Sequence, residues 1–349
     1  MEKEKKIKCV IWDLDNTIWD GILVEDQEVK PFEHVVKCIK ELDERGIINS
    51  ISSRNDYEDA ILRLKEMKLD QYFIFPQICW GDKSVSIDNI IKKIGISADT
   101  VAFVDDQLFE IDEVQKVHPN ILCIQSKDIL TMLENKRFIP QYITEDTKMR
   151  RQMYITDITR NEAEDNFVGT REEFLCTLDM KVEISLAKEN DLERLLELTE
   201  RTSQLNTTGF TYSYEQLSRL STSPNYKLLV VGLTDKYGTS GKIGLALIKV
   251  DNENGWTIEL LIMSCRVLSR GIGTILIDFI LEKANIKNKT VFAKFKKTSR
   301  NKMMYMTYAM AGFNFVEQKD DLVILKHPMK NIREIPLYVE IIDDTNEFL

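Results

Sequence analysis

The first third of the chain alternates short apolar runs with amphipathic helical patterns, and no other feature of the sequence restricts the fold as strongly. Strands that alternate with helices form a parallel, doubly wound sheet. The apolar runs predict strands at 9–12, 47–51, 101–104 and 121–124, and the helical patterns predict helices at 35–45, 57–67 and 83–94. Ligands of such sheets lie beyond the carboxyl ends of the strands. We therefore expect an α/β domain at residues 1–140 with its site at that edge.

A second alternation follows a charged segment, and a length of 349 residues also favours two domains. Residues 141–180 predict a helical connector, most simply a solvated linker helix packed on one domain. Further strands are predicted at 182–186, 226–232, 243–250, 257–264, 290–295 and 322–326, with helices at 191–204, 272–284 and 301–310. Adjoining strands with helices on their faces indicate a mixed sheet at 181–330. Residues 331–349 are expected to form an appended tail.

The composition excludes several classes of protein. A hydrophobic content of 43% with 30% charged residues is that of a globular protein, and a net charge of −10 argues against nucleic-acid binding. No apolar run approaches the roughly 20 residues of a membrane helix, and the start of the chain does not resemble a signal peptide. The six cysteines form no CxxC pair, which disfavours zinc and favours a cytoplasmic location.

Paired carboxylates end two of the predicted strands. Asp13 and Asp15 follow the first strand, and Asp105 and Asp106 follow the third. Alternation along a strand aims Asp13 and Asp15 to the same side. Carboxylates at the end of a buried run are costly unless a cation or proton compensates them, and hard oxygen ligands suit Mg²⁺. The alternative interpretation is an acidic surface on which this order arises by coincidence.

Two further strand-end positions are candidates for binding phosphate. One is Ser53, with Arg54 and Asn55 beside it, and the other is Lys83. The order Asp-x-Asp-x-Thr, Ser, Lys, Asp-Asp resembles the four motifs of phosphotransferases of the haloacid dehalogenase (HAD) superfamily.

That resemblance implies a role for each of these residues. Asp13 is the nucleophile that forms an aspartyl-phosphate, and Asp15 is the general acid and base. Ser53 and Lys83 hold the transferring phosphoryl group. Asp105 and Asp106 complete a Mg²⁺ shell together with Asp13 and a backbone carbonyl of Asp15. An inactive HAD domain is the alternative.

A closer resemblance extends over nearly the whole chain. The segments "CVIWDLDNTIWDGILVED", "PQICWGDKS", "FVDDQLFEIDEV", "TEDTKMRRQMY" and "IELLIMSCRVLSRGIGTILI" resemble the FkbH-like family, a HAD branch. The resemblance implies transfer of a glyceryl unit from 1,3-bisphosphoglycerate to the phosphopantetheine thiol of an acyl carrier protein, with removal of the remaining phosphate. It also implies a supply of three-carbon units to polyketide-type biosynthesis. The chain departs from the family pattern at Cys79, Leu108 and Ile111.

A glycine-bearing turn in the second domain resembles the acyl-CoA loop of GNAT-type acyltransferases. This turn, "SRGIGTIL", contains Arg270, Gly271 and Gly273 and opens a predicted helix. Backbone N–H groups at a helix N-terminus suit a pyrophosphate or a phosphodiester, so the loop is a candidate for binding the phosphopantetheine arm. Leu268 departs from the GNAT pattern, which has Gln or Arg at that position.

Cys265 ends the strand before this loop and is a candidate nucleophile. Arg266 and the helix N-terminus are positioned to lower the thiol pKa, and an acyl phosphate is already activated for transfer. Two alternatives stay open. Cys265 can be a small apolar packing residue, or the acyl group can pass directly to the carrier thiol.

Two more segments of the second domain carry candidate binding residues. Asn206 and Thr207 are candidates for substrate binding by resemblance, although helix capping would explain them equally well. The stretch from Lys287 to Lys302 holds seven basic residues and no acid. A solvated face is the default interpretation of such a stretch, and a docking patch for an acidic carrier protein is the second. For the whole chain, the rivals to glyceryl transfer are a phosphatase with an accessory domain and a non-catalytic scaffold.

Overall fold

The computed structural model describes residues 5–26, 28–251, 253 and 255–345, which form two compact units. The units are Met1–Ile155 and Thr156–Leu349. The boundary lies inside helix α7 (Arg150–Asp165), within the segment predicted as a connector. Short helices α6 (Glu145–Lys148) and α8 (Arg171–Cys176) precede and follow α7. Each unit has its own buried core, as expected for two domains.

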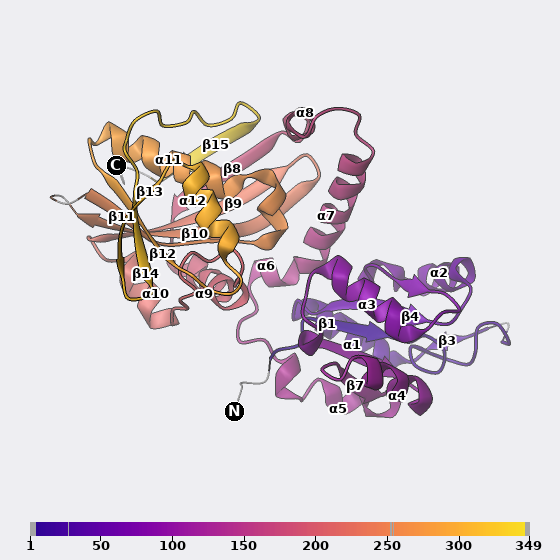
Figure 1. The fold of residues 1–349 in the computed structure, drawn as a ribbon. Helices are drawn as coiled ribbons and strands as arrows, with labels where there is room; N and C mark the ends of the chain where they lie inside the picture. The colour runs from indigo at the N-terminus through magenta and orange to yellow at the C-terminus, as the bar shows by residue number, and fades with distance from the viewer. Residues whose placement is uncertain (1–4, 27, 252, 254, 346–349) are drawn as a thin grey trace. The chain divides into compact units, whose positions relative to one another are not determined.

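The first unit contains a five-stranded parallel sheet with the order β5-β4-β1-β6-β7 (Figure 1). Its strands are β1 (Cys9–Trp12), β4 (Ile48–Ser53), β5 (Gln77–Ile78), β6 (Val101–Asp105) and β7 (Leu122–Gln125). Its main helices are α1 (Glu33–Glu44), α2 (Tyr57–Glu66), α3 (Lys83–Ile94), α4 (Leu108–Val117) and α5 (Ile129–Met132). A small hairpin joins β2 (Trp19–Asp20) to β3 (Lys30–Pro31). The predicted doubly wound α/β fold is therefore confirmed.

Strand β1 lies in the middle of the sheet, and its apolar sequence suits a strand that is covered on both faces. All four of its residues are buried, as expected for a strand of a parallel sheet with helices on each side. In register, Trp12 lies opposite Ile51 of β4 and Val104 of β6. The carboxyl ends of β4, β1 and β6 therefore meet at one edge. Helices α1 and α5 pack on each other, as do α3 and α4, and both pairs lie against the sheet.

The second unit contains an eight-stranded mixed sheet with the order β13-β14-β12-β11-β10-β9-β8-β15. Its strands are β8 (Met180–Leu186), β9 (Tyr226–Asp235), β10 (Gly238–Asp251), β11 (Gly255–Met263), β12 (Val291–Lys296), β13 (Asn314–Lys319), β14 (Leu322–Lys326) and β15 (Val339–Asp344). Its helices are α9 (Leu192–Arg201), α10 (Tyr214–Ser221), α11 (Ile272–Ile286) and α12 (Lys302–Met310). The element order and the parallel pairing of β11 with β12 agree with the expected GNAT-like mixed α/β fold.

The sheet opens between β11 and β12, and a short segment lies in the opening. The two strands pair only from Trp256 to Ile258 on β11. Beyond that point Thr207 lies between them: its N–H donates to the Leu261 carbonyl at 3.1 Å and its carbonyl accepts from Lys296 N at 3.0 Å. The Thr207 hydroxyl also accepts from Leu261 N at 2.9 Å. The candidate residues Asn206 and Thr207 are thus part of the sheet.

The two outer strands of this sheet differ from the sequence prediction. The segment 331–349, expected to be an appended tail, contributes β15, which pairs in parallel with β8. At the other edge, β13 is exposed along its whole length and carries a register shift between Phe315 and Glu317. Strand β15 pairs with a segment far away in the sequence, and the pairing of β13 with β14 carries a register shift. The local sequence pattern therefore did not reveal either strand.

None of the helices in the described part of the chain combines the length and the apolar character that crossing a membrane requires.

Candidate functional site

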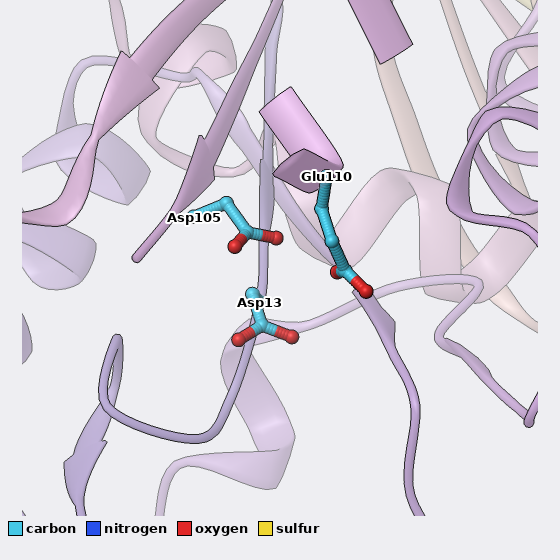
Figure 2. A group of neighbouring side chains, drawn as sticks. All are labelled: Asp13, Asp105 and Glu110. Carbon is cyan, nitrogen blue, oxygen red and sulfur yellow. The ribbon is translucent and has the colours of Figure 1, made fainter. Parts of the chain in front are cut away.

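Three buried carboxylates converge at the carboxyl edge of the first sheet (Figure 2). Asp13 follows β1, Asp105 ends β6, and Glu110 lies in the first turn of α4. One oxygen from each lies within 4.8 Å of the others. All three side chains are nearly inaccessible to solvent. Such a group is unfavourable unless positive charge lies within it.

Lys83 supplies part of that positive charge. Its ammonium lies 2.7 Å from Asp13 Oδ1 and 2.6 Å from Asp105 Oδ2, and it also contacts Glu110. Lys83 is the first residue of α3, which follows β5 at the same edge. Burial disfavours the ammonium, but the three carboxylates outweigh this effect and raise the Lys83 pKa above its ordinary value.

The surroundings shift the acidities of the carboxylates upward. Burial raises the pKa of Asp13 to about 6, although Lys83 and the Ser53 hydroxyl act in the opposite direction. Burial, followed by the charge of Asp13, raises the pKa of Asp105 to about 7. If all three acids are ionised, Lys83 leaves two negative charges uncompensated. A divalent cation with a preference for oxygen ligands therefore fits the set in both charge and donor type.

Asp15 does not join this group. Its Oδ1 accepts hydrogen bonds from Trp19 Nε1 at 2.7 Å and from Leu23 N at 3.1 Å, and its Oδ2 accepts from Asn55 Nδ2 at 2.9 Å. Asn16 follows in the left-handed region with φ of 52°, so the chain turns sharply after Asp15. Strand β1 ends at Trp12, so Asp13 and Asp15 both lie beyond it, and the hydrogen bonds of Asp15 hold its side chain against Trp19 and Asn55.

Asp106 also lies outside the group, and Glu110 takes the third position. The side chain of Asp106 is half-buried, and burial raises its pKa. The sequence pattern predicts that Asp105 shares the metal site with its neighbour Asp106, and it does not point to Glu110. The signal that could have identified Glu110 is an acid in the first helical turn after the strand that ends on Asp105, but α4 itself was not predicted.

Arg54 lies at the entrance to the group. Its guanidinium lies 3.2 Å from Glu110 and 3.6 Å from Glu113, and its Nε donates to the Gly81 carbonyl at 3.3 Å. A third of its side chain remains exposed. The candidates Ser53, Arg54 and Asn55 are thus all brought to the carboxylate edge: Ser53 beside Asp13, Arg54 beside Glu110 and Asn55 beside Asp15.

The matches by sequence are to phosphatase-type proteins. The model of the haloacid dehalogenase-like hydrolase family matches residues 18–122. A curated human protein, magnesium-dependent phosphatase 1, is 26% identical over 138 residues, which are 34% of this chain and 78% of that protein. The first unit therefore has a haloacid dehalogenase-like fold. The matched range includes Ser53, Lys83, Asp105 and Glu110, while Asp13 and Asp15 precede it.

Solved structures resemble each unit separately. The N-terminal part of BF1531 from Bacteroides fragilis, a phosphatase domain complexed with Mg, is 25% identical with a TM-score of 0.34 and covers 39% of this chain. The chain spans 41% of that protein's length. The ribosomal-protein-S18-alanine N-acetyltransferase of Escherichia coli is 16% identical with a TM-score of 0.34, and covers 42% of this chain and 94% of its own.

Outside the haloacid dehalogenase-like domain, the glycine-bearing loop lies between β11 and α11. Gly271 has φ of 70°, a conformation that favours glycine, and it begins α11 without a side-chain cap. Cys265 is exposed at the start of the 3-10 turn Cys265–Arg270. A helix N-terminus without a side-chain cap and an exposed thiol thus lie within one short segment.

Arg270 does not project into solvent from this loop. It is 3% exposed, and its guanidinium donates to Asp157 at 2.9 Å and to Ser240 Oγ at 3.1 Å. Arg160 of α7 binds Asp235 beside it through two nitrogens. Arg270 therefore attaches the loop to α7, and the backbone around Gly271 and Gly273 is the part that can receive a ligand.

Proposed function

We propose that the chain is an FkbH-like enzyme that transfers a glyceryl unit from 1,3-bisphosphoglycerate to the phosphopantetheine thiol of an acyl carrier protein and removes the remaining phosphate. The observation that carries the phosphate chemistry is the buried set of Asp13, Lys83, Asp105 and Glu110. The acyl chemistry is supported by the exposed Cys265 beside the uncapped N-terminus of α11.

In the first unit, Asp13 attacks the phosphorus atom. A bond forms between a carboxylate oxygen and phosphorus, and the bond between phosphorus and the glycerate oxygen breaks. The leaving oxygen takes a proton, and water later cleaves the aspartyl-phosphate to release inorganic phosphate. Lys83 and Ser53 are placed to bind the phosphoryl oxygens beside Asp13. Asp15 is the nearest candidate for the proton donor, held in place by Trp19 and Asn55.

Asp13, Asp105 and Glu110 are the residues that would hold Mg²⁺. When bound, the ion would neutralise the charge that develops on the phosphoryl oxygens. The similarity to a magnesium-dependent phosphatase supports this assignment.

In the second unit, we propose that Cys265 receives the acyl group. The thiolate sulfur forms a thioester with the glyceryl carbonyl carbon as the acyl phosphate bond breaks, and phosphate leaves. The carrier thiol then displaces Cys265 by thioester exchange. Backbone N–H groups near Gly271 would hold the phosphodiester of the phosphopantetheine arm at this point.

A second candidate function is a phosphatase for a small phosphorylated metabolite, because the matching family model lies within the first unit and the curated phosphatase covers only 34% of the chain. Intact-mass spectrometry separates the two functions. A holo acyl carrier protein incubated with the enzyme, 1,3-bisphosphoglycerate and Mg²⁺ should gain the mass of a glyceryl group. Phosphate release with an unchanged carrier mass would support the phosphatase instead.

A further inference from the structure

Helix α12 presents a stripe of methionines to solvent. Met303, Met306 and Met310 follow an i, i+3, i+7 spacing and are 51%, 45% and 66% exposed. The opposite side of the helix is anchored in the core by Met304 and Tyr308, which are both almost fully buried. The spacing therefore places the three methionines on one continuous face, which we call the methionine stripe. Exposed apolar surface of this kind marks interaction sites, and methionine adapts to the shape of a partner.

Unpaired cations lie at the N-terminal end of the stripe. Of the basic residues in this region, Lys294 is paired with Glu259 and Lys296 with Asp321. Lys297, Arg300 and Lys302 are exposed, and among the ion pairs of the described residues none involves them. Within residues 294–302 the unpaired cations of the described structure are therefore these three, and they adjoin α12.

The start of α12 itself lacks a negative partner. Its first turn contains no acid, and the Asn301 side chain does not cap it. Instead, Asn301 accepts from Thr298 N and donates to the Lys296 and Asn206 carbonyls. Three cations at the positive end of a helix repel one another and the helix dipole. Carboxylates supplied from outside would relieve this repulsion.

A second copy of this chain does not provide the required charge through the same helix. No Asp or Glu occurs anywhere between Lys283 and Val316. Two copies of α12 packed together would bring cations and methionines, but no carboxylate, to the contact. The chain as a whole has a net charge of −10, so its overall composition does not account for this local group of cations. The surface fits a helix that combines an apolar face with acidic side chains.

We infer that the methionine stripe, with Lys297, Arg300 and Lys302 at its end, is the docking surface for an acidic helix of the acyl carrier protein. Figure 1 shows helix α12, which carries the stripe. This inference rests on the proposed function for the identity of the partner. A helix of nine residues is about 14 Å long, which suits the crossing of a single partner helix. The methionine contacts would provide most of the binding affinity for the partner helix, and the cations would orient that helix and increase its association rate.

The test measures binding of a free-standing holo acyl carrier protein, labelled with a fluorophore, by anisotropy. One variant carries Met303→Gln, Met306→Gln and Met310→Gln, which keep side-chain length and helix propensity. A second carries Lys297→Gln, Arg300→Gln and Lys302→Gln. Each should weaken binding about tenfold or more. The loss in the charge variant should shrink at high salt, because screening weakens exposed charges. Phosphate release should stay unchanged in both.

Control variants change exposed residues elsewhere. Val168→Gln with Leu337→Gln removes two apolar side chains, and Lys116→Gln with Lys127→Gln removes two cations. Neither control should alter carrier affinity. Circular dichroism would verify that every variant is folded.

Each other outcome decides against the inference or against the proposed function. Stripe variants that bind the carrier as tightly as the wild type overturn the docking surface, even if loading proceeds. A change of oligomeric state in sedimentation velocity, with carrier affinity intact, would make the stripe a self-interface and also overturn it. If the wild type does not bind the carrier at all, both proposals fail. Binding through the stripe without glyceryl loading would refute the transfer reaction and keep the surface.

Discussion

Lys83 contacts all three carboxylates of the site, so its removal should expose how much of the first unit's stability depends on charge. In Lys83→Met the buried Asp13 and Asp105 lose their ion-pair partner and only Glu110 keeps a cationic neighbour, Arg54. Loss of one partner of a buried pair costs about 3 kcal/mol. We expect the variant to melt at a lower temperature in EDTA and to gain more from added Mg²⁺ than the wild type does. Thermal unfolding followed by circular dichroism measures both, with the exposed Lys92→Met as control. Equal gains from Mg²⁺ in both proteins would contradict a shared cation site.

Glu110 and Asp106 compete for the role of third carboxylate, and the structure favours Glu110. Glu110→Gln should raise the Mg²⁺ concentration needed for half-maximal phosphate release by at least the roughly tenfold typical of weakened metal sites. Asp106→Asn should have a much smaller effect. A Mg²⁺ titration of phosphate release compares the two variants directly. The reverse order would assign the position to Asp106.

At the residue scale, sequence reasoning found the acids that end strands and missed the contribution of a helix. Asp13, Ser53, Lys83 and Asp105 were predicted because strand ends in a parallel sheet must meet. Glu110 was missed because its position depends on where α4 begins. Side-chain periodicity does not report the direction of the backbone just beyond a strand.

Among the elements, β15 shows what long-range pairing adds to a local pattern. Val339 is buried at the edge of the second core, while Leu337, two residues earlier, is fully exposed. Val339→Asp should therefore place an unpaired charge in the core and destabilise the second unit by roughly 3 kcal/mol. Leu337→Asp should change little. Hydrogen exchange of β8 and β9 measures the local effect, and equal protection in the two variants would mean that β15 does not stabilise the sheet.

Strands and helices with strong periodicity were predicted close to their observed bounds, including α3 and β14. The elements that were not predicted include α10 and β15. Parallel pairing of β15 with β8 joins segments more than 150 residues apart, so no local signal could specify it. Burial of Arg270 was unexpected for a similar reason, because its partner Asp157 comes from a distant helix.

At the scale of the whole molecule, the proposed function divides the chemistry between the two units. Cys265→Ala should abolish carrier loading and yet leave phosphate release by Asp13 intact, since the two residues belong to different units. Without carrier, the wild type incubated with 1,3-bisphosphoglycerate should gain a hydroxylamine-labile adduct that the variant lacks. Intact-mass analysis detects the adduct, with Cys176→Ala as a matched control at another exposed cysteine. Wild-type loading by Cys265→Ala would show that the acyl group passes directly to the carrier.

The open edge at β13 affects how strongly the protein tends to aggregate at high concentration. An unpaired outer strand invites neighbouring molecules to extend the sheet, which is a common start of aggregation. The register shift after Phe315 and the charged side chains of Glu317 and Lys319 make this edge a poor template for a further strand. The molecule can therefore expose apolar surface on α12 for a specific partner while its nearby sheet edge resists fibril-like stacking.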